Sequence, residues 1–329
     1  MSDQKSTTPS IVTRGLTKRY GSLMALDNLT LEIGPGQVFG FIGPNGAGKT
    51  TTMKILSCLL RPDSGTAQVC GFDIATRADE VRRCIGYMPD FLGVYDDLTV
   101  DEYLQFFASI YGIPRKNRSS IIGQVLELTD LSVKRDSLVD GLSRGMQQRL
   151  GVARVLVHDP QVLFLDEPAS GLDPRARIEM RSLLVELGKM GKTLMVSSHI
   201  LSELAEMSTC IGIIERGKLL YAGSIEDAYA RTKAAANMSE RIAIKLEVEG
   251  MPASAVAARL TGDKRISGVK HDDASRTLTV DLAPIAESQH GHHFLLEAIM
   301  QIGGRIESFQ PEQVRLEDAF LKLTTGALQ

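Results

Sequence analysis

The 329-residue sequence predicts an α/β fold, in which a mainly parallel sheet is covered by helices and followed by a small α+β domain. Short apolar runs at 38–42, 162–165 and 193–196 are typical of buried strands. Between the last two runs, residues 174–190 carry the apolar spacing of a helix. Strands that alternate with helices form a parallel sheet with both faces covered. The length of the chain favours two domains of unequal size.

The composition is that of an ordinary globular protein, with 43% apolar and 23% charged residues. No apolar run approaches the ~18 residues that suggest a membrane span. The polar tail at 1–10 lacks the apolar stretch of a secretory signal, so we expect a cytoplasmic protein. The net charge of −3 argues against a nucleic-acid partner. Four cysteines without a paired spacing argue against a metal site or a disulfide framework.

The other strands of the first domain are bounded by glycine, proline and polar turns. They are predicted at 11–20, 23–33, 66–74 and 85–88, with a hairpin at 210–224 that turns at Arg216-Gly217.

Helices are predicted where apolar residues recur at spacings of three and four. One helix follows the strand at 38–42 and ends before Pro62. The stretch from about 96 to 160 is mainly helical and contains a capping box, Thr99-Val-Asp-Glu102. A third helix starts near Pro174, and its inward side chains are predicted to be Ile178, Leu183, Leu187 and Met190.

A small, polar segment at 230–239 marks the expected domain boundary. We therefore expect a first domain at 11–230, with a helical subdomain at about 91–160, and a C-terminal α+β domain at 240–329. Strands are predicted in that domain at 242–250, 277–283 and 305–310, and helices at 253–260, 292–303 and 315–326. Three histidines there, at 290, 292 and 293, are expected in a solvated turn, because no acid or cysteine shows a ligand spacing with them.

The loop after the first buried strand reads "GPNGAGKTT" (43–51) and fits the pattern G-x-x-x-x-G-K-[ST]. Gly43 and Gly48 let successive backbone N–H groups converge on a phosphate, and the following helix adds its positive end. Lys49 would reach the β- and γ-phosphates, and the Thr50 hydroxyl would bind Mg²⁺. A strand before the loop and a helix after it are the context that this motif requires.

The strand at 162–165 ends in two adjacent acids, Asp166 and Glu167. Mg²⁺ at the loop must be held from a second side, and Asp166 is the candidate for that contact. Glu167 points differently and would accept a proton from a water that attacks the γ-phosphate. The alternative is a strand that ends in a solvated acidic turn.

A third motif, "LSRG" (142–145), opens a helix with Leu150, Ala153 and Leu156 facing inward. Ser143 and Gly145 at the helix start could offer a hydroxyl and backbone donors to an anion. Taken alone, an N-cap serine also explains this segment.

The ordered motifs "GPNGAGKTT", "LSRGMQQR", "VLFLDEP", "SGLD" and His199 in "VSSH" resemble the ATP-binding subunits of ABC transporters over residues 11–230. The resemblance implies a P-loop NTPase of the ABC type, in which an antiparallel β subdomain and a helical subdomain accompany the parallel sheet. It implies an ATPase that uses ATP and Mg²⁺. The implied nucleotide contacts within the loop are Gly43, Asn45, Gly46, Gly48, Lys49, Thr50 and Thr51.

The resemblance also implies roles outside the loop. Tyr20 would stack on adenine, although a tyrosine packed on the core is the alternative. Ser143 and Gly145 would contact the γ-phosphate of ATP held by the opposite subunit, and Asp173 would lie in the loop that communicates across the dimer. His199 would contact the γ-phosphate, with a strand-end histidine satisfied by its neighbours as the alternative.

The chain departs from the family at the signature motif, where Arg144 and Met146 stand in place of the usual glycine and glutamine. A second departure is Asp90, where the family has a glutamine that contacts Mg²⁺. An aspartate keeps an oxygen ligand for the metal and adds a negative charge, so Asp90 is a predicted metal ligand. Its alternative is a solvated loop acid.

We expect the ATPase subunit of an ABC transporter that works as an exporter, attached to the inner face of the membrane through its partner. It would act as a homodimer on a separate membrane-spanning permease, because one set of motifs and no membrane domain are present. The membrane contact is expected near residues 90–111. The C-terminal segment resembles an accessory domain of drug-export-type ABC ATPases, with 315–326 as its closing helix. The alternatives are a regulatory module that binds ATP with little turnover and a soluble ABC ATPase without a transport role.

Overall fold

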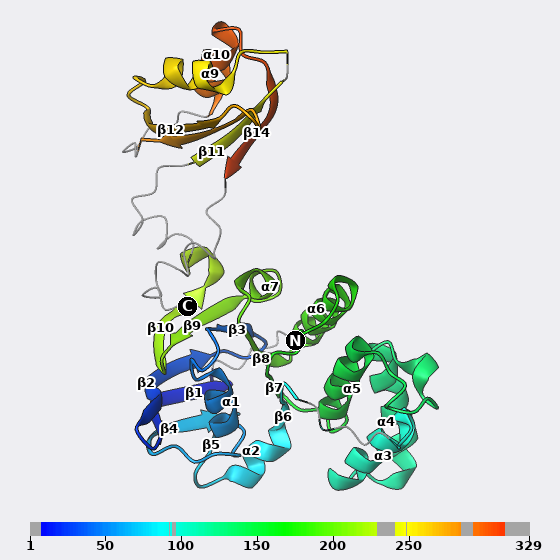
Figure 1. Ribbon diagram of the computed structural model, residues 1–329. Coiled ribbons are helices and arrows are strands. Elements are labelled where there is room, and N and C mark those ends of the chain that lie inside the picture. The colour runs from blue at the N-terminus through cyan, green and yellow to red at the C-terminus, as the bar shows by residue number, and fades with distance from the viewer. Residues whose placement is uncertain are drawn as a thin grey trace, which may run out of the picture. The chain divides into compact units, whose positions relative to one another are not determined.

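The computed structural model describes residues 8–91, 93, 97–228, 241–247, 249–283 and 292–312, which fall into two compact units, 8–225 and 226–312 (Figure 1). The predicted boundary at 230–239 and the predicted helix at 315–326 lie outside the described residues. In the described part, no helix is both long and apolar enough to cross a lipid bilayer.

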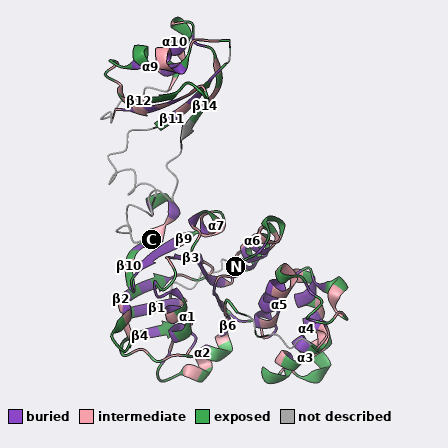
Figure 2. Ribbon diagram, in the orientation of Figure 1, coloured by how far each residue is buried: buried purple, intermediate pink, exposed green. Residues whose placement is uncertain are grey.

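A six-stranded sheet in the order β10-β9-β3-β8-β7-β6 forms the centre of the first unit. Its strands are β3 (Val38–Ile42), β6 (Ile85–Met88), β7 (Val162–Leu165), β8 (Thr193–Ser198), β9 (Cys210–Glu215) and β10 (Lys218–Ser224). All neighbours are parallel except β9 and β10. Every residue of β3, β7 and β8 is buried (Figure 2). The predicted mainly parallel α/β fold is therefore confirmed.

An antiparallel sheet in the order β2-β1-β4-β5 accompanies the central sheet. Its strands are β1 (Ile11–Tyr20), β2 (Leu23–Ile33), β4 (Ser64–Val69) and β5 (Phe72–Asp73). One apolar core includes residues of both sheets and of the helix α1 (Lys49–Leu56). The prediction of a single strand at 66–74 was wrong, because the backbone at Cys70 and Gly71 is left-handed (φ +52° and +77°) and reverses the chain between β4 and β5.

The helical subdomain contains α3 (Val100–Ile110), α4 (Arg115–Leu128), the 3₁₀ turn η1 (Ser132–Lys134) and α5 (Arg144–Leu156), which gather beside the sheets (Figure 1). The predicted capping box at the start of α3 is present, since Thr99 and Glu102 satisfy each other's backbone N–H groups. Leu150, Ala153 and Leu156 of α5 are buried as predicted.

The described part of the first unit also contains the helices α2 (Ala78–Cys84), α6 (Pro174–Lys189) and α7 (Leu201–Ala205). The predicted inward face of α6 was partly wrong. Ile178 and Met190 are 54% and 55% exposed, whereas Leu183 and Leu187 are buried. Met180 and Leu184 complete the buried stripe.

The second unit has the element order β-α-β-β-α-β, a split βαβ arrangement. Its elements are β11 (Arg241–Leu246), α9 (Ala253–Leu260), β12 (Ile266–Asp272), β13 (Thr277–Leu282), α10 (His293–Gln301) and β14 (Ile306–Glu312). The sheet order is β12-β13-β11-β14, and all neighbours are antiparallel. Both helices and the strands enclose a core of their own. The edge strand β12 was not predicted, because none of its residues is fully buried and its apolar alternation is weak.

Candidate functional site

The glycine-rich loop joins β3 to α1, as its motif predicts. Gly48, immediately before α1, has φ +112°, and a Cβ there would lie 2.6 Å from the carbonyl oxygen of Ala25. A Cβ on Gly43 would collide with the carbonyl oxygen of Ile214. Glycine is therefore required at both positions, and the loop N–H groups and the start of α1 are held together where an anion can be bound.

Lys49 is almost fully buried at the first position of α1. Its Nζ donates to the carbonyl oxygens of Gly43 (2.5 Å) and Pro44 (3.4 Å). The same Nζ lies 3.3 Å from Oε1 of Glu167. The structure thus brings the predicted phosphate-binding lysine and the predicted general base into direct contact.

Asp166 and Glu167 leave the end of β7 in different directions. Asp166 is 1% exposed and accepts a hydrogen bond from the Ser197 hydroxyl at 2.6 Å. Glu167 has a left-handed backbone (φ +49°), and its N–H donates to the same hydroxyl at 2.9 Å. The Glu167 carboxylate pairs with Lys49 and, through Oε2, lies 3.0 Å from Nδ1 of His199. A strained backbone at Glu167 is consistent with a functional position.

Tyr20 and Asp90 line one cavity of about 250 Å³ together with the loop residues 44–51 and Glu167. Tyr20, at the end of β1, is 48% exposed and is therefore not packed into the core. Burial raises the pKa of Asp90, and the carboxylates of Asp166 and Glu167 raise it further, against the opposing charges of Arg144 and His199.

Ser143, Gly145 and Asp173 lie apart from that cavity. Ser143 is the N-cap of α5, and its hydroxyl accepts a hydrogen bond from the N–H of Met146 at 3.4 Å. Within the single chain, Ser143 therefore acts as the N-cap that was the alternative to anion binding. Asp173 is the N-cap of α6 and accepts from the N–H of Ala176 at 2.9 Å. These residues line a separate cavity of about 270 Å³ between the starts of the two helices.

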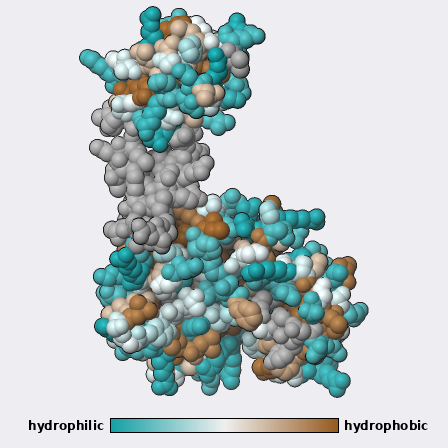
Figure 3. Space-filling view, viewed as in Figure 1, coloured by the Kyte–Doolittle hydropathy of each residue, from teal (hydrophilic) through white to brown (hydrophobic). Residues whose placement is uncertain are grey.

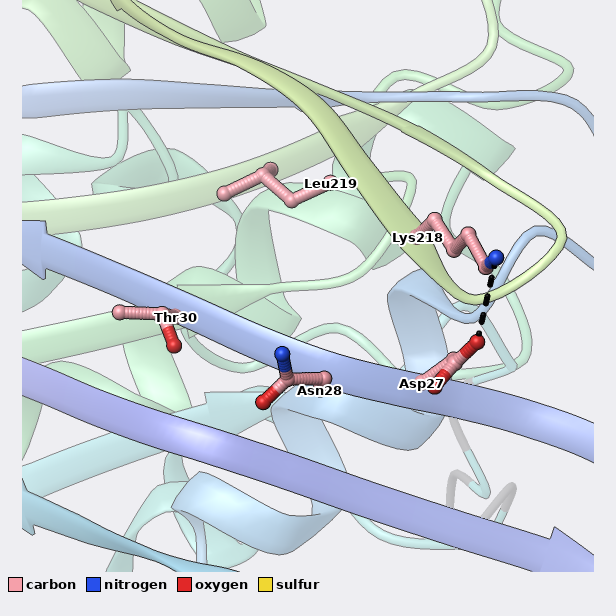
Figure 4. A pocket seen from close by; sticks show the side chains of 5 residues that line it. All are labelled: Asp27, Asn28, Thr30, Lys218 and Leu219. Atoms are coloured by element: carbon pink, nitrogen blue, oxygen red, sulfur yellow. Dashed lines mark ion pairs between the residues drawn. The ribbon is translucent and has the colours of Figure 1, made fainter.

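A hollow of about 460 Å³, larger than the cavity at the glycine-rich loop, lies between β2 and β10 (Figure 4). Its lining residues are Asp27, Asn28, Thr30, Lys218 and Leu219, and the two charges within it, Lys218 and Asp27, pair at 3.4 Å. None of the predicted site residues lines it, so size alone does not identify the site.

Ser197 is a site residue that the sequence did not single out. Its hydroxyl joins Asp166 to the backbone of Glu167, which orients both acids. The available signal was its place near the end of a strand, two residues before His199, but its contacts depend on β8 lying beside β7.

The comparisons with known proteins all identify the same protein family. A family model described as "ABC transporter" matches residues 26–170. The bacitracin transport ATP-binding protein BcrA of Bacillus licheniformis is 44% identical over 211 residues, which cover 64% of this chain and 68% of BcrA. The Nod factor export ATP-binding protein I of Ralstonia nicotianae is 40% identical over 216 residues, covering 66% of this chain and 67% of that protein.

A further relative, the probable multidrug ABC transporter ATP-binding protein YbhF of Escherichia coli, is 38% identical over 222 residues, covering 68% of this chain and 38% of YbhF. Among solved structures, cbiO1 from Clostridium perfringens, part of the ABC transporter complex cbiONQ, has a TM-score of 0.63 and 26% identity, covering 69% of this chain and 92% of that one. An ATP-binding subunit of an ABC transporter has a TM-score of 0.61 and 26% identity, covering 68% of this chain and 93% of that one.

Proposed function

The chain belongs to the ATP-binding subunits of ABC transporters and is an ATPase, and from that premise we propose that it drives export through a separate membrane-spanning subunit. Export is supported by the names of its relatives, which act in bacitracin transport, Nod factor export and multidrug transport. A place at the inner face of the membrane follows from dependence on such a partner.

The contact between Lys49 and Glu167 beside the glycine-rich loop is the observation that carries the proposed mechanism. Lys49 and the loop N–H groups bind the β- and γ-phosphates of ATP, and Tyr20 stacks on adenine. Glu167 accepts a proton from water as the water oxygen attacks the γ-phosphorus. The bond from phosphorus to the β–γ bridging oxygen breaks, and ADP and phosphate leave. His199 orients the Glu167 carboxylate and contacts the γ-phosphate.

The donor set of the site fits magnesium. The Thr50 hydroxyl at the first turn of α1, the buried Asp166 carboxylate and Asp90 offer the hard oxygen atoms that Mg²⁺ prefers, and the metal commonly takes only one or two carboxylates together with substrate phosphates. Bound Mg²⁺ would supply positive charge against the β- and γ-oxygens. Ser197 holds Asp166 in place for this contact.

A second copy of the chain would complete the site. Ser143, Gly145 and Asp173 lie in a cavity of their own and not beside the loop of the same chain. Their place at the N-termini of α5 and α6 suits contact with the γ-phosphate of ATP on an opposite subunit. We therefore propose a homodimer that closes on two ATP molecules.

The contact with the membrane-spanning subunit is proposed on the helical subdomain and the segment before it. Phe91, Phe106, Ile110 and Tyr111 are 85%, 43%, 62% and 40% exposed. Figure 3 shows hydrophobic side chains on the surface of this part of the unit. Exposed apolar patches of this kind mark protein–protein contacts.

The proposed domains remain 11–230 and 240–329, with the second as an accessory domain of the drug-export type.

Phosphate release by the purified chain tests the enzymatic part of the proposal. We expect MgATP-dependent turnover, and a loss of about 10²–10⁴-fold in Glu167→Gln, because the amide cannot accept the proton. Glu186→Gln, which removes an exposed carboxylate from α6, is the matched control. Equal turnover in Glu167→Gln and its control would exclude Glu167 as the base. Co-purification with a membrane protein tests the transport part.

A further inference from the structure

Arg149 lies in the second turn of α5, the helix that Ser143 caps, and it is almost fully buried. Its Nη1 donates to Oδ2 of Asp130, in the turn after α4, at 2.9 Å. Its Nη2 lies 3.6 Å from Oε2 of Glu179 on α6. A buried guanidinium needs such carboxylate partners, because an unpaired charge away from water is costly. Arg149 therefore joins α5 both to the end of α4 and to α6.

The ion pairs continue toward the start of α6. Glu179 also accepts a hydrogen bond from Nε of Arg175 at 3.0 Å, one turn closer to the N-terminus of that helix. Arg175 lies two residues after Asp173, the N-cap of α6. A continuous row of charges thus connects the turn after α4, the body of α5 and the first turn of α6.

The row of charges lies in the wall of the cavity of about 270 Å³ at the starts of α5 and α6, which Ser143 and Asp173 also line. Asp130, Arg149 and Glu179 line that cavity and a second one, of about 340 Å³, beside α4. Atoms that face a hollow lose packing contacts on that side. The Arg149 guanidinium is therefore a contact between the helices at a level where their packing is incomplete.

α5 and α6 also meet at a second point, where a Cβ on Gly145 would lie 2.7 Å from Cβ of Ala176. One close contact between two helices allows them to pivot about it. A further contact, the pair of Arg149 with Glu179, fixes the angle between them. The relative position of the two helix N-termini therefore depends on Arg149.

We propose that Arg149 is a positioning residue for the nucleotide of the opposite subunit: it sets the start of α5 against the start of α6, so that Ser143 and Asp173 form one surface. The inference rests on the proposed homodimer, in which these two residues meet the ATP bound by the other chain. Arg149 lies outside the cavity at the glycine-rich loop. Loss of its ion pairs should therefore leave ATP binding by its own chain intact and weaken closure on the other chain.

Two measurements on the full chain in a Glu167→Gln background, where hydrolysis is suppressed, separate these effects. Titration with a fluorescent ATP analogue and Mg²⁺, at protein concentrations too low for dimers, measures affinity at the loop, and sedimentation velocity measures MgATP-dependent dimerisation. We expect Arg149→Gln to change the loop affinity by less than about twofold and to weaken dimerisation by about tenfold. Glu179→Gln, which removes the α6 partner at a partly exposed position, should have the same two effects without disturbing the buried residue. Arg181→Gln, which removes the ion pair between α6 and Glu206, is the matched control and should change neither quantity.

Normal dimerisation of both Arg149→Gln and Glu179→Gln would overturn the inference. Equal losses of loop affinity and dimerisation in these variants would overturn it as well, because they would show a general structural role. The double variant should lose no more than Arg149→Gln alone, and additive losses would mean that the two residues do not act through each other. Failure of the Glu167→Gln chain itself to dimerise with MgATP would contradict the proposed homodimer, whereas a dimer that forms equally well without Arg149 contradicts this inference alone.

Discussion

At the scale of single residues, Asp90 carries a charge that its surroundings disfavour. Burial and two neighbouring carboxylates raise its pKa, so the folded state binds the Asp90 proton more tightly than the unfolded state does. Below the unfolded pKa, Asp90 is protonated in both states and costs no stability. As pH rises through the raised folded pKa, the ionised form destabilises the folded state.

Asp90→Asn should therefore raise the thermal unfolding temperature of the nucleotide-free chain at pH 7.5, and the gain should vanish as the pH falls below the unfolded pKa of Asp90. The expected gain is under about 1 kcal/mol, because Asp90 is exposed and water screens its charge. Thermal unfolding of both proteins across this pH range measures the difference. Asp140→Asn, at an exposed loop position, is the control. A lower unfolding temperature for Asp90→Asn at pH 7.5 would show that the charge is favourable in place.

Ser197 presents the opposite case, a neutral side chain that satisfies a buried charge. Ser197→Ala removes the hydroxyl that donates to Asp166 and accepts from the N–H of Glu167. Loss of that bond to a buried group should cost about 1–3 kcal/mol of stability. Turnover should fall as well, because both acids lose their anchor.

Urea unfolding and phosphate release measure the two effects of Ser197→Ala. Ser198→Ala is the matched control. The Ser198 hydroxyl contacts Glu203 and the N–H of Ile200, and it contacts neither Asp166 nor Glu167. If the two alanine variants behave alike, Ser197 has no special role in holding Asp166.

The sequence singled out Lys49 and Glu167, but it did not show that the two side chains are in contact. Lys49 and Glu167 were assigned from motifs 118 positions apart, and the structure brings them to 3.3 Å. Ser197 could not be found in the same way. Its role exists only because β8 lies beside β7, and strand order is a tertiary property that no local spacing encodes.

At the scale of elements, local signals predicted helix starts well and buried faces less well. The capping box at Thr99 identified the start of α3, because its two hydrogen bonds are made within four residues. The face of α6 was misassigned because apolar residues at 178 and 190 were counted as inward. The buried set, Met180, Leu183, Leu184 and Leu187, follows the regular i, i+3, i+4, i+7 stripe.

The contact between α5 and α6 predicts that one substitution destabilises the protein and that a second substitution restores the stability. Gly145→Ala would place a methyl group 2.7 Å from Cβ of Ala176, so the helix starts must separate. Overpacking of this kind costs about 1–3 kcal/mol. Ala176→Gly in the same chain removes the obstructing methyl group and should restore most of the lost stability.

Thermal unfolding of Gly145→Ala, Ala176→Gly and the double variant measures this coupling. The double variant should be more stable than Gly145→Ala alone. A double variant that loses the sum of the two single losses would mean that the helices do not meet at these two residues.

At the scale of the whole molecule, each of the two units has an apolar core of its own in the described part of the chain. The core of the first unit includes Ile55 of α1, the helix that follows the glycine-rich loop, and the core of the second includes Ile244 of β11. Both side chains are almost fully buried. A domain with its own core can unfold without its neighbour. This supports the proposed division of the chain into an ATPase domain and an accessory domain.

Matched substitutions in the two cores test that division. Ile55→Ala and Ile244→Ala remove the same atoms, and each should cost its own unit about 2–5 kcal/mol. We expect Ile55→Ala to lower both the unfolding temperature of the first unit and MgATP affinity, because α1 carries Lys49 and Thr50. Ile244→Ala should lower a separate calorimetric transition and leave MgATP affinity unchanged. Equal losses of MgATP affinity in both variants would mean that the second unit supports the nucleotide site, and that the accessory domain is energetically part of the ATPase.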